Sequence, residues 1–239
     1  MTEQNLMRLL SGLAAPILAP LRDLPSGAHV VQLACGTGTL SLELARQRPD
    51  LRITGIDNNP AVLPSGTANA EFRVMDMARL DFPDGGADAV ISRMGLLLPS
   101  TAPVGVASRE AARVLRTDGI LSLATWPDLA SSPYTGIGLS VLRELLPDVP
   151  DVEAAFAGYT EELEGFRDVA ATTYHWDTEY PDFESWWAFC AGFGPLAGLF
   201  ARADEQKARA VMAEHIAGFR TGSGGYRLPA SCRLITARR

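Results

Sequence analysis

Two glycines and two aspartates near the start of the chain are spaced as a nucleoside-binding site requires. Gly36-Thr37-Gly38 follows an apolar run typical of a buried strand, and a glycine turn between a strand and a helix lets the backbone approach a ligand closely. Asp57 ends a second apolar run about 20 residues beyond Gly36, where a carboxylate can accept hydrogen bonds from ribose hydroxyls. Asp76 ends a third run and could accept from the exocyclic amine of adenine.

The same segment does not support a pyrophosphate site. The dinucleotide fingerprint G-x-G-x-x-G needs a third glycine, and Ser41 stands at that position. A nucleoside site without a phosphate site suits S-adenosylmethionine better than NAD. Two structural alternatives stay open, because the glycines could form a tight turn that holds no ligand and the aspartates could cap neighbouring turns.

Three histidines are available as a general base, the usual role of this side chain when a hydroxyl or an acidic carbon must lose a proton. His29 begins the first expected strand and is predicted to be structural. His215 lies on a helix with charged neighbours and is predicted to face solvent. His175, between Tyr174 and Trp176, is the predicted catalytic residue, against the alternative of a structural histidine.

An aromatic segment in the second half of the chain is the best indication of the substrate. We expect its side chains to form a lid with an apolar, partly stacking wall, although a core patch or a dimer interface would give the same pattern. No basic cluster lies nearby, so the predicted substrate is an apolar or aromatic small molecule. The predicted substrate contacts in this segment are Tyr174, Trp186, Trp187, Phe189 and Phe193.

Short β-rich runs alternate with helical patterns, which predicts an α/β fold with a parallel sheet. The expected strands are 29–35, 52–57, 71–75, 87–92, 120–126, 169–176 and 226–237, and helices are expected at 39–47, 103–115, 152–163 and 204–219. We predict one domain over 1–239, with an N-terminal helical segment at 1–27, a cofactor-binding half at 28–126 and a substrate-side half at 127–239. Helical insertions are expected at about 131–147 and 182–221.

Composition excludes several classes of protein. The chain has 239 residues, a formal charge of −7 and 47% hydrophobic residues, so disorder is not expected and a nucleic-acid partner lacks the basic clusters it would need. Three cysteines without paired spacing give neither a disulfide framework nor a zinc signature, which predicts a reduced, cytoplasmic protein without metal. Neither a signal peptide nor a membrane span is expected, and the predicted state is a monomer or a homodimer.

Several segments resemble, in order, the motifs of class I S-adenosylmethionine-dependent methyltransferases. The resemblance is to the small-molecule branch that includes ubiquinone and menaquinone biosynthesis enzymes, and it spans nearly the whole chain. The matching segments are Val31–Gly38, Gly55–Asp57, Met75–Met77, Phe82–Val90, Arg109–Arg116, Asp118–Trp126, Gly165–Val169, Tyr226–Pro229 and Leu234–Arg238.

The resemblance implies a Rossmann-like, mostly parallel sheet of seven strands with an antiparallel last strand, helices on both faces and helical lid insertions. The cofactor would lie over the carboxyl ends of the strands, with Met94 near the reacting methyl group and the substrate. The residues that would bind the cofactor are Gln32, Ala34, Cys35, Gly36, Gly38, Asp57, Asn58, Asp76, Met77 and Arg93. Gln32 departs from the family, which usually has an acid at this position to help bind the methionine end.

The sequence therefore predicts an enzyme that transfers a methyl group from S-adenosylmethionine, leaving S-adenosylhomocysteine. The predicted acceptor is a hydroxyl or a carbon of a secondary metabolite or a quinone-like compound. Gln32 and the lack of an obvious base motivate an alternative, a protein of the same fold that binds the cofactor but catalyses a methyl-free step such as cyclisation. A non-catalytic interaction protein that uses the apolar lid is the third hypothesis.

Overall fold

The computed structural model describes residues 10–96, 104–125, 133–150, 163–192 and 194–239. Contacts within the chain group these residues into two compact units, which we describe separately. The sheet unit contains the described residues of 13–125, 158–173 and 233–239, and the helical unit contains those of 10–12, 133–150 and 174–232. The expectation of a single domain over 1–239 stays a prediction.

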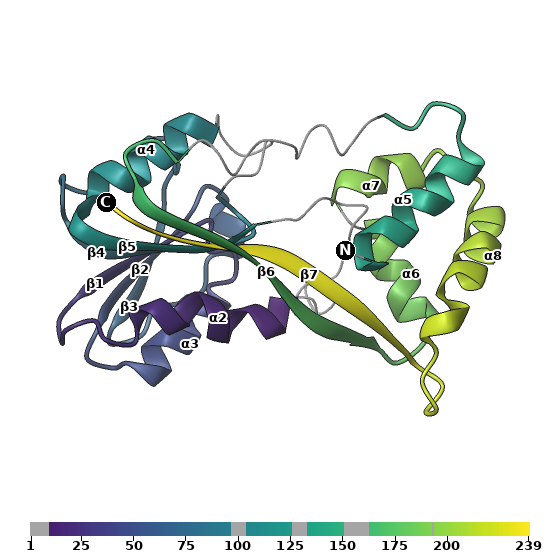
Figure 1. Ribbon diagram of the computed structural model, residues 1–239, viewed down its shortest axis with the longest axis horizontal. Helices are drawn as coiled ribbons and strands as arrows, with labels where there is room; N and C mark the ends of the chain where they lie inside the picture. The colour runs from purple at the N-terminus through teal and green to yellow at the C-terminus, as the bar shows by residue number, and fades with distance from the viewer. Residues whose placement is uncertain (1–9, 97–103, 126–132, 151–162, 193) are drawn as a thin grey trace. The chain divides into compact units, whose positions relative to one another are not determined.

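A seven-stranded sheet with the order β3-β2-β1-β4-β5-β7-β6 confirms the predicted fold class (Figure 1). Neighbouring strands from β3 to β5 pair in parallel, whereas β7 pairs antiparallel to β5, with Leu121 opposite Ala237. The strands are β1 (His29–Leu33), β2 (Arg52–Asp57), β3 (Ala70–Val74), β4 (Ala87–Arg93), β5 (Leu115–Thr125), β6 (Arg167–Tyr180) and β7 (Tyr226–Arg238).

Helices cover both faces of the sheet within the sheet unit. α2 (Ala14–Leu18) and α3 (Thr39–Gln47) lie on one face and α4 (Val104–Val114) on the other (Figure 1). The Oγ of Ser122 on β5 donates to the carbonyl oxygen of Ile17 at 2.7 Å, which ties α2 to the sheet. Short 3₁₀ turns occur at Ser11–Leu13, Ala19–Leu21 and Pro60–Val62.

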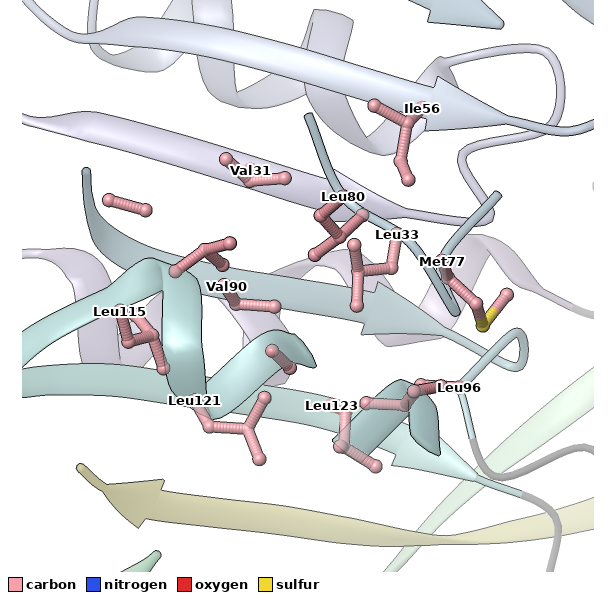
Figure 2. Packing of buried hydrophobic residues seen from close by; sticks show 14 of the residues in the cluster. Val31, Leu33, Ile56, Met77, Leu80, Val90, Leu96, Leu115, Leu121 and Leu123 are labelled. Carbon is pink, nitrogen blue, oxygen red and sulfur yellow. The ribbon is translucent and has the colours of Figure 1, made fainter. Parts of the chain in front are cut away.

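An apolar core lies between the sheet and α4 (Figure 2). Every residue of β1 is buried, as expected for a parallel strand that is covered on both faces. From α4, Ala107 and Ala111 contribute small side chains to the same cluster, one helical turn apart. Residues labelled in Figure 2 from the sheet and its loops are Val31, Leu33, Ile56, Met77, Leu80, Val90, Leu96, Leu115, Leu121 and Leu123.

The helical unit contains four helices and parts of β6 and β7. Its helices are α5 (Pro133–Leu145), α6 (Phe183–Gly192), α7 (Gly194–Phe200) and α8 (Glu205–Ile216), followed by a 3₁₀ turn at Ala217–Phe219. α5 lies within the first expected insertion, at about 131–147, and the other three helices lie within the second, at about 182–221. That these segments are insertions stays a prediction. The helix expected at 152–163 lies almost entirely outside the described residues. Among the described residues, no helix has both the length and the apolar character that crossing a membrane requires.

His29 begins β1 and packs in the interior of the sheet unit. Its Nδ1 lies 3.0 Å from the carbonyl oxygen of Gly86, and its Nε2 lies 2.9 Å from Oγ1 of Thr54. The ring also meets Phe82 edge-on, with ring centroids 5.8 Å apart. Because a carbonyl oxygen only accepts, Nδ1 carries a proton. The single proton of the Thr54 hydroxyl goes either to Nε2 of the neutral ring or to the Glu71 carboxylate, which lies 3.1 Å from Oγ1.

Protonation of His29 should weaken the fold. Burial lowers the pKa of His29 below the usual 6.5, and the Arg52 guanidinium lowers it further, against the raising effects of the Gly86 carbonyl and the Glu71 and Asp88 carboxylates. The unfolded chain then binds the proton more readily than the folded chain. The neutral histidine therefore stabilises the fold above the unfolded pKa of about 6.5, and this contribution is lost as the pH falls below that value.

We expect the urea midpoint of unfolding to fall between about pH 7 and about pH 5 in the wild type and to fall less in His29→Gln. His175→Gln is the matched control, because His175 is exposed on β6 and its loss should leave the pH profile unchanged. Superimposable profiles for the wild type and His29→Gln would show that His29 does not carry this dependence.

Candidate functional site

The turn between β1 and α3 is built from left-handed backbone. Ala34, Gly36 and Gly38 have φ of 49°, 53° and 69°, a conformation that glycine adopts readily and other residues adopt at a cost. The two glycines differ in their surroundings. A Cβ on Gly38 would lie 2.5 Å from the Phe72 ring, whereas a Cβ on Gly36 would meet no atom within 4 Å. Gly36 thus leaves open space above the backbone, where a ligand could lie.

Asp57 ties the end of β2 to this turn. Its Oδ2 accepts a hydrogen bond from the backbone N–H of Gly36 at 2.9 Å, and its Oδ1 accepts from the N–H of Asn59 at 3.0 Å. A carboxylate oxygen has more than one acceptor site. Each oxygen can therefore accept a further hydrogen bond from a ligand hydroxyl while it holds the turn.

A small open pocket of about 90 Å³ lies beside Asp57, at the carboxyl ends of the strands. Asp76 lines it, and its Oδ1 accepts from the N–H of Ala78 at 2.8 Å. The full lining is Ala34, Ile56, Asp57, Asn58, Met75, Asp76 and Met77, so the structure brings together five of the predicted cofactor residues. Sequence reasoning missed Ile56 and Met75 as lining residues, although each directly precedes a predicted aspartate.

Gln32 is buried, and its side-chain oxygen already accepts hydrogen bonds from within the protein. Oε1 accepts from the backbone N–H of Ser41 at 3.0 Å and from its Oγ at 2.6 Å. The amide therefore caps the first turn of α3 and holds it against β1. Its predicted contact with the cofactor stays a prediction.

Cys35 is buried within the turn. Its backbone N–H donates to the carbonyl oxygen of Ile56 at 2.8 Å. Burial and the nearby Asp57 carboxylate raise the pKa of the Cys35 thiol to about 12. The group is therefore a neutral thiol near neutral pH and not a nucleophile.

Arg93 and Met94 lie at the carboxyl end of β4. Arg93 donates from Nη2 to Oγ1 of Thr39, the first residue of α3. Burial lowers the pKa of Arg93 to about 10, which leaves the guanidinium protonated at neutral pH. Met94 is buried, has φ of 61°, and donates its N–H to the carbonyl oxygen of Ala124 at 2.9 Å.

The predicted base and the predicted aromatic substrate contacts described here belong to the helical unit, whereas Met94 belongs to the sheet unit. On β6, His175 is exposed, and Tyr174 is half-buried and stacks on Trp176 with ring centroids 6.0 Å apart. Trp187 on α6 is half-buried and packs edge-on against Phe200. The roles predicted for these residues stay predictions.

Two further aromatic residues form the interior of the helical unit. Trp186 and Phe189 are both 0% exposed and pack against each other and against Tyr180. This packing accounts for their size and apolar character without a ligand, and their predicted substrate contact stays a prediction. Phe193, predicted to contact the substrate, lies outside the described residues. Within the described part of the chain, no group of three or more His, Cys, Asp or Glu side chains could hold a metal ion.

A segment of the sequence matches a known class of domain. Residues 30–119 match the family model described as a methyltransferase domain. This match confirms the resemblance found in the motifs for that segment of the sheet unit.

Named relatives extend this finding. The chain is 32% identical over 178 residues to 2-methyl-6-phytyl-1,4-hydroquinone methyltransferase of Synechocystis sp., covering 70% of this chain and 54% of the relative. It is 29% identical over 140 residues to demethylmenaquinone methyltransferase of Deinococcus radiodurans, covering 56% of this chain and 57% of the relative. The chain thus spans little more than half the length of these relatives.

Solved structures share the fold. The structure of phosphoethanolamine N-methyltransferase 2 from Haemonchus contortus in complex with S-adenosyl-L-methionine matches 95% of this chain and 52% of that chain. The TM-score is 0.56 and the sequence identity is 11%, which establishes similarity of fold alone.

Proposed function

We propose that this chain is an S-adenosylmethionine-dependent methyltransferase that acts on a hydroxyl or a carbon of an apolar or aromatic small molecule, such as a quinone-like compound or a secondary metabolite. The observation that carries the proposal is the hydrogen bond from the Gly36 N–H to Asp57, which places a carboxylate beside an open glycine turn and a pocket. The quinone-related relatives support the acceptor class.

The residues present fit the adenosine part of this cofactor. Asp57 would accept from the ribose hydroxyls and Asp76 from the adenine amine, between the apolar side chains of Ile56, Met75 and Met77. The pocket of about 90 Å³ is smaller than the roughly 300–1,000 Å³ that pockets for small-molecule ligands usually have. The rest of the ligand would therefore extend over the glycine turn, where Gly36 leaves space.

When bound, the cofactor supplies a methyl group that is already activated on a sulfonium. The protein then contributes mainly alignment and exclusion of water. The glycine turn and Asp57 would fix the position of the ligand, and the neutral Cys35 thiol would not compete as a nucleophile. His175 is our candidate to accept a proton from the acceptor, and Tyr174 and Trp187 are candidates for stacking on it.

Three further assignments belong to the proposal. The cysteines of the described chain, Cys35, Cys190 and Cys232, are buried and free, which fits a reducing compartment, and we propose the cytoplasm. The proposed partner is the small-molecule acceptor, and we propose neither nucleic acid nor a membrane. The proposed assembly is a monomer or a homodimer.

Transfer of radiolabel from methyl-labelled S-adenosylmethionine to substituted 1,4-hydroquinones and 1,4-naphthohydroquinones tests the reaction. We expect label in the organic extract with the wild type and none after heat denaturation of the enzyme. Conversion of an acceptor without label would instead support the methyl-free alternative. Failure of the wild type to bind S-adenosylhomocysteine, together with a tightly co-purifying protein, would support the interaction hypothesis.

A further inference from the structure

The loop between β3 and β4, residues 75–86, carries three of the residues that line the pocket, Met75, Asp76 and Met77. The loop also folds back on itself, because the thioether sulfur of Met75 accepts from the Asp81 N–H at 3.3 Å. Met77 is buried in the apolar core between the sheet and α4 (Figure 2). The position of the pocket-lining residues therefore depends on what holds the rest of this loop.

The side chain of Arg113, in the last turn of α4, binds the later part of the loop at three places. Nη2 donates to the carbonyl oxygen of Leu80 at 2.8 Å, and Nη1 donates to the carbonyl oxygen of Phe82 at 2.9 Å. Nη1 also donates to Oδ1 of Asp84 at 2.7 Å. Both bonds to carbonyl oxygens are partly buried, and such bonds are stronger than they would be in water.

Glu110, one helical turn before Arg113, orients the guanidinium and binds the same loop. Its two carboxylate oxygens accept from Nε of Arg113 at 2.8 Å and from Nη2 at 2.9 Å, which is a bidentate pair. Oε2 also accepts from the Leu80 N–H at 2.7 Å. Hydrogen bonding from Arg113 lowers the pKa of Glu110, against the raising effect of burial, so the carboxylate is charged at neutral pH. Two side chains of α4 thus hold Leu80 at both its N–H and its carbonyl oxygen.

We propose that Arg113 is a positioning residue that, together with Glu110, fixes the place of Asp76 and thereby the preference of the pocket for adenine over a purine with a 6-oxo group. This inference rests on the proposed function, in which the Asp76 carboxylate accepts from the adenine amine. A carboxylate distinguishes an amine from a carbonyl only when its oxygen lies at hydrogen-bond distance and angle. Arg113 would act on this selectivity through the loop, without contacting the ligand.

Isothermal titration calorimetry with S-adenosylhomocysteine and S-inosylhomocysteine measures this preference. The second ligand carries a carbonyl oxygen where adenine carries its amine, so that position cannot donate to Asp76. In the wild type we expect S-adenosylhomocysteine to bind at least about tenfold more tightly than S-inosylhomocysteine. In Arg113→Met we expect this ratio to fall below about threefold, with most of the loss in the affinity for S-adenosylhomocysteine.

A double-mutant cycle shows whether Arg113 acts through Asp76. In the wild-type background, Arg113→Met should weaken S-adenosylhomocysteine by about three- to tenfold. In the Asp76→Ala background, the same change should leave that affinity within about twofold, because the acceptor that Arg113 positions is already absent. A general structural role for Arg113 predicts an equal loss in both backgrounds.

Milder variants keep the test decisive where Arg113→Met does not fold, as urea unfolding would show. Arg113→Lys keeps the charge but not the planar fork, and Glu110→Gln keeps an oxygen for the Leu80 N–H but not the charge. Each should give a ratio between that of the wild type and about one. Arg116→Met is the matched control, because Arg116 pairs with Asp88 on β4, and its ratio should equal that of the wild type.

The outcomes distinguish this inference from the proposed function. If the wild type binds neither ligand, the proposed function is wrong. If the wild type binds S-adenosylhomocysteine but does not prefer it to S-inosylhomocysteine, only the positioning role is wrong. The same holds if the folded variants of Arg113 and Glu110 keep the wild-type ratio, or if Arg113→Met causes equal losses with and without Asp76.

Discussion

Replacing Asp57 by alanine is expected to weaken S-adenosylhomocysteine binding at least about a hundredfold. The change removes the acceptor for the ribose hydroxyls, and each charge-assisted hydrogen bond contributes about 1.5–3 kcal/mol. It also leaves the Gly36 and Asn59 N–H groups without their carboxylate partner. The turn itself would therefore lose part of its order, which adds to the loss of affinity.

Calorimetry on three variants separates these contributions. Asp57→Asn retains one side-chain oxygen that can accept from Gly36, so it should lose less affinity than Asp57→Ala. Asp23→Ala changes an exposed aspartate of the same unit and is expected to bind like the wild type. Unchanged binding in Asp57→Ala, in a protein that is folded by circular dichroism, would remove Asp57 from the site and with it the proposed placement of the ribose.

The position of this site was predictable because its residues mark strand ends. The second strand was expected at 52–57 and is observed there, and α3 was expected at 39–47 and begins and ends at those residues. Carboxyl ends of parallel strands meet at one edge of a sheet. A glycine turn after one buried run and an aspartate after the next therefore had to lie close together, as the 2.9 Å bond between Gly36 and Asp57 confirms.

Other features of the fold depend on contacts between residues that are far apart in the sequence, and no local sequence pattern indicates them. β5 begins at Leu115, directly after α4, although the strand was expected to start at Ile120. The pairing of β5 with β4 shifts register between Leu115 and Ile120, and Asp118 has φ of 61°, so the residues between them form an irregularity within the strand.

The sequence also could not predict which residues each side chain contacts. Gln32 occupies the position of an expected cofactor ligand, but its oxygen binds Ser41, and only the packing of α3 on β1 brings these two residues together. The aromatic segment gives a second case. Trp186 and Phe189 are one helical turn apart on α6, and such spacing is equally typical of a buried face and of a pocket wall. In the structure both are fully buried beside Tyr180.

Alanine substitutions at the two glycines of the turn are expected to have different consequences, although the backbone strain is similar. Gly36 and Gly38 both have positive φ, and a residue with a Cβ loses about 1–2 kcal/mol there. At Gly38 the new Cβ would also lie 2.5 Å from Phe72 and 2.8 Å from Pro64. Overpacking of this kind adds about 1–3 kcal/mol, so Gly38→Ala should lower the free energy of unfolding by about 2–5 kcal/mol.

Gly36→Ala should destabilise the fold less than Gly38→Ala, and its main effect should be on ligand binding. Its Cβ would enter open space in the protein, so only the strain of about 1–2 kcal/mol should appear in urea unfolding. The same methyl group would occupy the volume in which we place the ligand, and we expect S-adenosylhomocysteine affinity to fall at least about tenfold. If folded Gly36→Ala binds as tightly as the wild type, the ligand does not pass over this turn. Equal unfolding free energies for the two variants would contradict the packing of Phe72 against Gly38.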